Sequence, residues 1–314
     1  MNMPDLHKLA VQSRSMREAG ITLLIASGVL ALFLIISPAT KPASTAVTIN
    51  TPAAPDAFGN ISVEAKAAIV YDLATGQILY AKNAQAQLPL ASLTKLLTVY
   101  AALAELSPET PITIPADAAT VDAPRAFSVG QTFLLSDLAR LTLTGSLNDG
   151  AVAIADATAA RENKTQTAML AGAAAALSLS QTYALNGSGL DVNTAISGGY
   201  GSADDLARLA GALVEHASSI AAATTYSSSK ASSQGGTSFT IKNTDPIIGT
   251  IPNLLLSKTG YTDLAGGNLA LVFDAAIEHP IAVVVLGSSK QGRFTDGATL
   301  VAATLAHFAG VSSL

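Results

Sequence analysis

The chain has 314 residues, enough for one large or two ordinary domains, and a formal net charge of -5. Without a basic footprint we expect no nucleic-acid partner. The chain has no cysteine, which excludes disulfides and thiolate chemistry, and none of its four histidines stands beside a serine of a hydrolase motif. The sequence also contains neither G-x-S-x-G nor H-E-x-x-H. A histidine-dependent hydrolase and a zinc enzyme are therefore disfavoured, and we expect neither a metal nor a cofactor.

A basic arm and an apolar run come first in chain order. Lys8, Arg14 and Arg17 lie in residues 1–20, and Ile21–Ser37 is uncharged and rich in Leu and Ile. At ~1.5 Å per residue the run spans roughly 26 Å, close to the ~30 Å hydrocarbon core of a bilayer. The basic flank predicts a cytoplasmic N-terminus, with the chain beyond residue 50 exported. A single-pass anchor in the cell membrane is the favoured interpretation, and a cleaved signal peptide is the alternative.

Residues 38–60 are rich in Pro, Ala and Thr and show little hydrophobic patterning. That composition predicts a flexible tether rather than a domain. We expect the folded domain to cover residues 61–310.

Strand and helix patterns divide this domain into three parts. Alternating or short apolar runs predict strands at Ala67–Tyr71, Gln77–Tyr80, Ser238–Lys242, Asn268–Phe273 and Ile281–Leu286. Helical periodicity predicts helices at Leu93–Leu106, Leu134–Thr144, Gly150–Ala160, Thr165–Leu179, Ser202–Glu215 and Thr295–Phe308. Ser202 with Asp205 three residues later predicts an N-cap. Strands at both ends of a helical middle predict one α+β domain, in which helices flank a largely antiparallel sheet beside a helical lobe.

The first helix begins with Ser92-Leu93-Thr94-Lys95. Residues three apart on a helix are neighbours, so Lys95 can take the proton of Ser92 without any histidine. The structural alternative is that Ser92 caps the helix while Lys95 extends from it to solvent. A second Ser-x-x-Lys, Ser227–Lys230, lies in a polar run without apolar periodicity, and we interpret it as solvated surface.

Two further motifs follow, Ser146-Leu147-Asn148 and Lys258-Thr259-Gly260. Each is weak alone, and Lys258 for example fits an exposed lysine at the end of a strand. The three motifs in this order are typical of class A β-lactamases and penicillin-binding proteins. The ordered set therefore favours a catalytic site over three unrelated structural positions.

From about Ile61 to Thr304 the sequence resembles the D-alanyl-D-alanine carboxypeptidases, the low-molecular-mass penicillin-binding proteins of the S11 serine peptidase type. Beyond the motifs, the resemblance covers Tyr71–Tyr80, Leu185–Asp191, Asn243-Thr244-Asp245, Lys258–Thr262 and Arg293-Phe294-x-Asp296. It implies the serine β-lactamase and DD-peptidase fold. Departures are mild: Leu90 and Gly187 replace usual prolines, and Leu147 replaces a usual glycine and would narrow the cleft beside Asn148.

The resemblance also implies catalytic roles. Ser92 would attack the carbonyl of a D-Ala-D-Ala bond and form an acyl-enzyme, and Ser146 would relay a proton to the leaving D-alanine. Lys95 must be neutral to act as a base, which needs a pKa well below the usual value of about 10.4. Burial and a second cation, Lys258, would lower it.

Substrate binding would fall to five further positions. The resemblance implies Asn148, Lys258, Thr259, Gly260 and Tyr261. Asn148 would hold a substrate amide, and Lys258 with Thr259 would hold the terminal carboxylate. The backbone N–H groups of Ser92 and Tyr261 would form the oxyanion hole.

The expected substrates are peptidoglycan stem peptides, with β-lactams as covalent inhibitors. A class A β-lactamase needs a glutamate that activates the deacylating water, and the nearest, Glu162, lacks the Glu-x-x-Leu-Asn context. The motifs do not separate carboxypeptidase from DD-endopeptidase. A catalytically silent peptidoglycan-binding or β-lactam-sensing protein would usually lose a motif residue, and all are present here.

Overall fold

A computed structural model describes residue 16 and residues 56–310, which are the residues discussed below. The predicted apolar run at 21–37 and most of the predicted tether lie outside these residues. Within the described part of the chain, no helix is both long and apolar enough to cross a membrane. Residues 56–310 lie in one compact unit.

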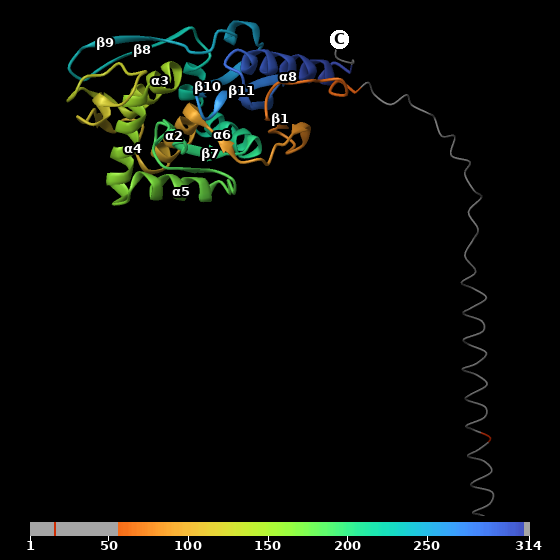
Figure 1. The fold of residues 1–314 in the computed structure, drawn as a ribbon, viewed down its shortest axis with the longest axis horizontal. Coiled ribbons are helices and arrows are strands. Elements are labelled where there is room, and N and C mark those ends of the chain that lie inside the picture. The colour runs from red at the N-terminus through yellow and green to blue at the C-terminus, as the bar shows by residue number, and fades with distance from the viewer. Residues whose placement is uncertain (1–15, 17–55, 311–314) are drawn as a thin grey trace, which may run out of the picture. The chain divides into compact units, whose positions relative to one another are not determined.

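A five-stranded sheet runs through the centre of this unit, in the order β10-β11-β12-β1-β2 (Figure 1). Its strands are β1 (Ala67–Asp72), β2 (Ile78–Lys82), β10 (Leu254–Thr262), β11 (Gly266–Ala276) and β12 (His279–Ser288). Each neighbouring pair is antiparallel, and β1 joins the last strand, with Ile69 opposite Val284. The pairing of β1 with β12 joins the first and last strands of the domain in one sheet, whose edge strands are β10 and β2.

Alternate residues of the central strands face two different cores, because successive side chains of a strand point to opposite faces. In β12, Ile281, Val283 and Val285 face helix α8 (Gly292–Phe308). The residues between and after them, Ala282, Val284 and Leu286, face helix α6 (Ala203–His216). Figure 1 shows α8 and α6 on opposite sides of the sheet. Burial on both faces explains why Leu269–Phe273 of β11 and Ile281–Leu286 of β12 are unbroken apolar runs.

The helical lobe holds α2 (Thr94–Glu105), α3 (Leu135–Gly145), α4 (Asn148–Glu162) and α5 (Gln166–Ala176). Helix α2 packs against α4, α5 and α6, so it lies between the lobe and the sheet (Figure 1). The remaining elements are β3 (Leu88–Pro89), η1 (Ala91–Leu93), β4 (Pro111–Thr113), η2 (Ala118–Thr120), β5 (Thr132–Leu134), β6 (Tyr183–Ala184), β7 (Gly199–Gly201), α7 (Ser218–Ala223), β8 (Ser228–Ser232), β9 (Ser238–Lys242) and η3 (Ile248–Thr250). Every strand pair in the described residues is antiparallel.

The predicted α+β architecture is confirmed, and each predicted strand and helix is present, β9 with the predicted bounds and the others with shifted ends. Strands β3 to β8, helix α7 and strand β10 had not been predicted; in β10 the apolar start and polar end show no period of two. Ser202 is an N-cap as predicted, since its Oγ accepts the N–H of Asp205 at 3.1 Å. Folded structure begins earlier than residue 61: Ala57 is buried, and the Phe58 ring lies 6.0 Å from that of Tyr80.

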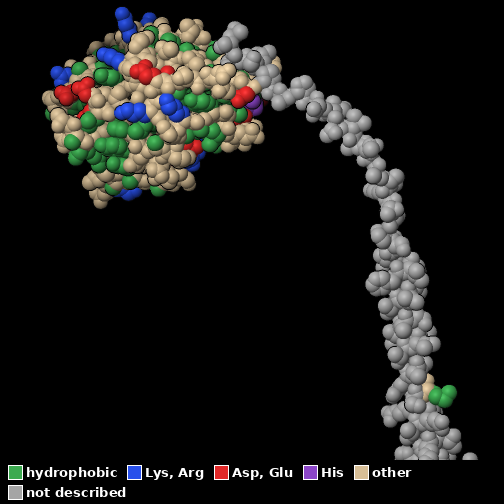
Figure 2. All heavy atoms as spheres, turned by 45° about the vertical axis from the view of Figure 1, so that its right-hand side comes forward, with side chains coloured by type: hydrophobic (Ala, Val, Ile, Leu, Met, Phe, Trp, Pro, Cys, Tyr) green, Lys and Arg blue, Asp and Glu red, His purple; other side chains and the backbone are tan. Residues whose placement is uncertain are grey.

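The surface of the unit mixes charge with apolar area. Figure 2 shows Lys and Arg interspersed with Asp and Glu on one face, with apolar side chains between them. This mixture agrees with the small net charge of the chain.

Candidate active site

The Ser92–Lys95 pair lies where η1 runs into α2. Lys95 Nζ is 2.8 Å from Ser92 Oγ, as expected for residues three apart. Lys95 is fully buried, and no side chain caps the start of η1 or of α2. The alternative of a capping serine with a solvent-seeking lysine is therefore wrong.

Two glycines let other segments approach the backbone of Ser92. A Cβ on Gly189 (φ +75°) would lie 1.9 Å from the carbonyl oxygen of Ala91, and one on Gly260 would lie 3.3 Å from the Ser92 nitrogen. Ala91 itself has φ +48°, in the left-handed region that favours glycine. The turn before Ser92 is thus enclosed by the Leu185–Asp191 segment and by β10.

The amine of Lys95 has three neighbours that define how it can react. Besides Ser92 Oγ, its Nζ lies 2.7 Å from Asn148 Oδ1 and 2.7 Å from the carbonyl oxygen of Ser188. Those two oxygens can only accept, so they take two N–H groups of the amine. In a neutral amine the remaining lone pair then faces the hydroxyl of Ser92, which is the geometry of a general base.

Burial holds the pKa of Lys95 well below its usual value, and the nearby charge of Lys258 lowers it further, while Asp149 opposes the change. The low-dielectric surroundings disfavour the ammonium form. These are the two causes that the resemblance implied, with burial as the larger. The neutral base that acylation requires is therefore accessible.

Ser146 and Lys258 form a second pair, close enough to Lys95 for the Lys258 charge to act on it. Ser146 follows α3 with φ +56°, and its Oγ lies 2.9 Å from Lys258 Nζ, which also donates to the Thr259 carbonyl at 2.8 Å. Burial, followed by the charge of Arg293, lowers the pKa of Lys258 to about 7. Lys258 is only 1% exposed, so the alternative of an exposed strand-end lysine is wrong.

The rest of the third motif is buried beside Lys258, and Tyr261 after it is partly exposed. The hydroxyls of Thr259 and Thr244 are 2.6 Å apart, and Arg293 Nη1 donates to the Gly260 carbonyl at 2.5 Å. The side chain of Tyr261 is 43% exposed, with the Lys290 ammonium 5.2 Å from its ring centroid. The structure therefore brings all eight predicted positions into one region spanning η1, α2, α4 and β10.

Several contributors had not been predicted. The Ser188 carbonyl, the Asp149 carboxylate and the Arg293 guanidinium each act on one of the two lysines through a hydrogen bond or through charge. Ser188 and Arg293 lie in segments of the family resemblance, and Asp149 directly follows the motif asparagine. Their positions were thus visible in the sequence, but their distances to the lysines were not.

The second Ser-x-x-Lys copy leads into strand β8, with Ser227 and Lys230 both exposed, which confirms the surface interpretation. Leu147 is buried in the main hydrophobic core, so its side chain fills core space, and the narrowing of a cleft beside Asn148 stays a prediction.

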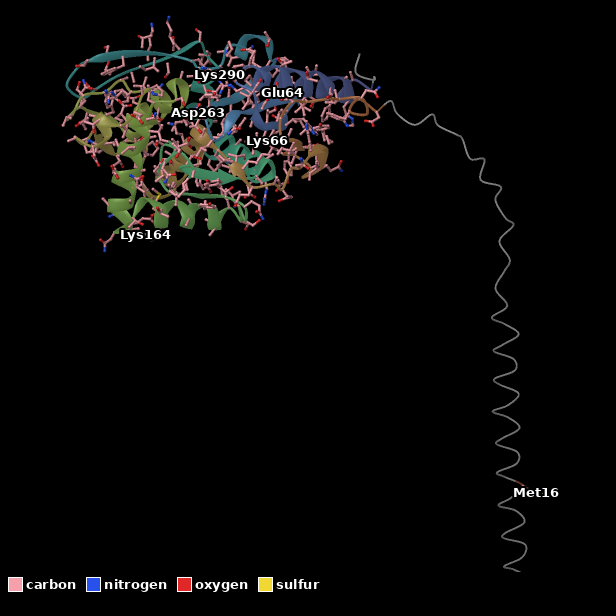
Figure 3. All side chains as sticks on the ribbon, in the orientation of Figure 1. Met16, Glu64, Lys66, Lys164, Asp263 and Lys290 are labelled. Carbon is pink, nitrogen blue, oxygen red and sulfur yellow. The ribbon has the colours of Figure 1, made fainter. Side chains whose placement is uncertain are left out.

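Glu162 lies far from Ser92. It ends α4 fourteen residues after Asn148, which at ~1.5 Å per residue is roughly 21 Å along the helix. Its carboxylate pairs with Lys164 at 2.8 Å. Figure 3 shows Lys164 at the edge of the helical lobe, well separated from Asp263 and Lys290 near the end of β10. Glu162 is therefore not placed to activate a deacylating water.

Comparisons with known proteins agree with this geometry. The model of the D-alanyl-D-alanine carboxypeptidase family, peptidase S11, matches residues 49–290. A D-alanyl-D-alanine endopeptidase of Pseudomonas aeruginosa is 30% identical over 74% of this chain and 74% of its own. The D-alanyl-D-alanine carboxypeptidase DacD of Salmonella typhimurium is 29% identical over 81% of this chain, which spans 66% of the DacD sequence.

A solved structure shows the same fold. Penicillin-binding protein D2 of Listeria monocytogenes, in its ampicillin-bound form, superposes with a TM-score of 0.67 and 26% identity, covering 78% of this chain and 98% of that one. The same protein has also been solved with cefotaxime bound. The family match covers the three motifs and most of the described domain, and the chain belongs to the D-alanyl-D-alanine carboxypeptidase family of serine peptidases.

Proposed function

We propose that this chain is a serine D-alanyl-D-alanine carboxypeptidase that removes the terminal D-alanine from peptidoglycan stem peptides. One observation carries the proposal. The buried amine of Lys95 lies 2.8 Å from Ser92 Oγ, and Asn148 and Ser188 provide acceptors for its N–H groups. This arrangement supplies a nucleophile and a base without histidine or metal.

Acylation begins when Ser92 Oγ attacks the carbonyl carbon of the D-Ala-D-Ala bond and its proton passes to Lys95 Nζ. The backbone N–H groups of Ser92 and Tyr261 stabilise the oxyanion that forms. The C–N bond then breaks, leaving an ester on Ser92. The leaving amine takes a proton through Ser146, whose hydroxyl is hydrogen-bonded to Lys258.

Substrate orientation falls to the remaining motif residues. The side-chain amide of Asn148 has two N–H donors. One donates to the Asp122 carbonyl at 2.9 Å, and the other would bind a substrate carbonyl. The Thr259 hydroxyl and the positive field of Lys258 would hold the terminal carboxylate. Gly260 lets β10 approach the Ser92 turn. Water then attacks the ester with Lys95 as base and regenerates Ser92.

A product assay tests this function. The purified protein, incubated with a peptidoglycan pentapeptide, should release free D-alanine, with no loss of activity in EDTA. The Ser92→Ala variant should release none. If the wild-type protein releases no D-alanine from monomeric or cross-linked peptides, the proposed activity is refuted.

A DD-endopeptidase is the second candidate, because the Pseudomonas aeruginosa relative bears that name. The two activities share the acylation step and differ in the leaving group. Cleavage of cross-linked dimers, without release of D-alanine from monomers, would identify an endopeptidase. Rapid turnover of penicillin would instead indicate a β-lactamase, against which the position of Glu162 argues. We expect β-lactams to acylate Ser92 and inhibit the enzyme.

We further propose that residues 21–37 anchor the chain in the cell membrane, with residues 1–20 in the cytoplasm and the catalytic domain outside. The charge asymmetry of the N-terminal segment supports this topology. An unstructured tether over residues 38–55 would span about 23 Å at ~5–6 Å × √n. N-terminal sequencing of the mature protein tests the proposal. A mature chain that begins after residue 37 would mean that the segment is a cleaved signal peptide.

A further inference from the structure

A buried carboxylate beside the site has no part in the mechanism above. Asp149 lies in the first turn of α4 and is 0% exposed. Its Oδ2 accepts the N–H groups of Ala126 and Phe127, both at 2.7 Å, and its Oδ1 accepts the Gly150 N–H at 2.8 Å. Burying a charged group costs free energy unless it is hydrogen-bonded, so these three contacts stabilise the carboxylate of Asp149 in the protein interior.

The segment that Asp149 holds also contacts the motif asparagine. This segment, residues 122–127, is called the 122–127 loop below. The Asn148 backbone N–H donates to the Pro124 carbonyl at 2.7 Å, and its Nδ2 donates to the Asp122 carbonyl at 2.9 Å. Because Nδ2 is held by Asp122, Oδ1 faces Lys95 Nζ at 2.7 Å. The loop and Lys95 together therefore determine which way the amide points.

The loop has one other firm attachment. Residues 122–125 are exposed, whereas Phe127 is buried, with its ring 4.8 Å from that of Phe133 and 5.3 Å from that of Phe239. The aromatic contact fixes one end of the loop to the core. The carboxylate of Asp149 fixes the same end to α4, next to Asn148.

We propose that Asp149 is a positioning residue that holds the 122–127 loop and thereby orients the Asn148 side-chain amide between Lys95 and the substrate. The inference rests on the proposed function, since it assigns a further residue to the same catalytic site. Asp149 is not a catalytic residue here, because none of its hydrogen bonds reaches Ser92 or Lys95. Its charge also opposes the lowering of the Lys95 pKa, which is a second route by which it acts on the base.

A double-mutant cycle separates positioning from general support of the fold. The rate constant for acylation of the full-length protein by a fluorescent penicillin is measured for wild type, Asp149→Asn, Asn148→Ala and the double variant. We expect Asp149→Asn to slow acylation by about 10-fold or more in the wild-type background and by less than about 3-fold in the Asn148→Ala background, a coupling within the range for contacting residues.

Two further variants complete the design. Asp137→Asn makes the same change in the first turn of α3, on a partly exposed carboxylate paired with Arg140, and should leave the rate unchanged. Phe127→Leu loosens the loop without altering charge, and its effect should also depend on Asn148. Phe127→Leu tests the role of the loop without changing a charge near Lys95. It replaces Asp149→Asn in the cycle if that variant does not fold.

The outcomes are distinct. Coupling of both Asp149→Asn and Phe127→Leu to Asn148→Ala supports the inference. Effects that add, so that each change slows acylation equally with and without Asn148, overturn it and leave the proposed function intact. A wild-type protein that takes up no penicillin at Ser92 overturns both.

Discussion

Replacing Lys258 with methionine is expected to abolish a pH dependence of protein stability. Methionine keeps an apolar stem of similar length but has no charge. The pKa of Lys258 is lowered to about 7 by burial and by Arg293, whereas the unfolded chain has the ordinary value of 10.5. Between these two values the unfolded state binds more protons than the folded state, so stability rises with pH through that window. Below pH 7 both states carry the proton and the full destabilisation is present.

The size of this effect follows from the pKa difference. A shift of about 3.5 units corresponds to roughly 5 kcal/mol of destabilisation below pH 7. Between pH 6 and pH 9 the free energy of unfolding should rise by about 3 kcal/mol through Lys258 alone. Loss of the Lys258 charge also raises the pKa of Lys95 toward its usual value, which flattens the profile of the variant further. The hydrogen bonds lost to Ser146 and Thr259 lower stability at every pH, so they do not mimic this slope.

Urea unfolding at pH 6, 7.5 and 9, followed by circular dichroism, measures the difference between wild type and Lys258→Met. Titrating groups that do not interact with Lys258 are common to both proteins and cancel in the comparison, whereas Lys95 changes in the direction given above. The exposed Lys230, on β8, provides the matched control, and Lys230→Met should retain the wild-type slope. Parallel profiles for wild type and Lys258→Met would refute the reasoning, since they would mean that Lys258 remains charged in the folded protein throughout this range.

The remaining predictions concern the nucleophile, the turn before it and the distant glutamate. Mass spectrometry should locate labelled penicillin on Ser92; Ser92→Ala should abolish labelling, and Lys95→Ala should slow it by the ~10²–10⁴-fold typical of a lost general base. An adduct elsewhere would contradict the assignment. Gly189→Ala should cost at least about 1–3 kcal/mol in urea unfolding, because alanine is strained at φ +75° and its Cβ would meet the Ala91 carbonyl. Glu162→Gln should leave the release of bound penicillin unchanged, and slower release in this variant would restore the β-lactamase interpretation.

The sequence alone determined much of the local structure and the identity of the chemistry. Apolar periodicity located α2, and a lysine three residues after Ser92 on that helix was sufficient to predict their contact, because helix geometry is local. The motifs at Ser146 and Lys258 were recognised by their order. Their side chains, however, are 112 residues apart in sequence and meet only because β10 joins the sheet beside the lobe.

Tertiary structure alone decided the properties that depend on burial and on long-range contacts. The pKa of Lys95 is lowered mainly because α2 is enclosed, and no sequence pattern states how much water a side chain loses. The Ser188 carbonyl carries no side-chain signal, since any residue there offers the same oxygen. In the sequence Asp149 directly precedes the predicted helix Gly150–Ala160, an ordinary place for a carboxylate, and only the fold brings the 122–127 loop over it. Local geometry follows from neighbouring residues, whereas desolvation and backbone contacts exist only once the whole chain has folded.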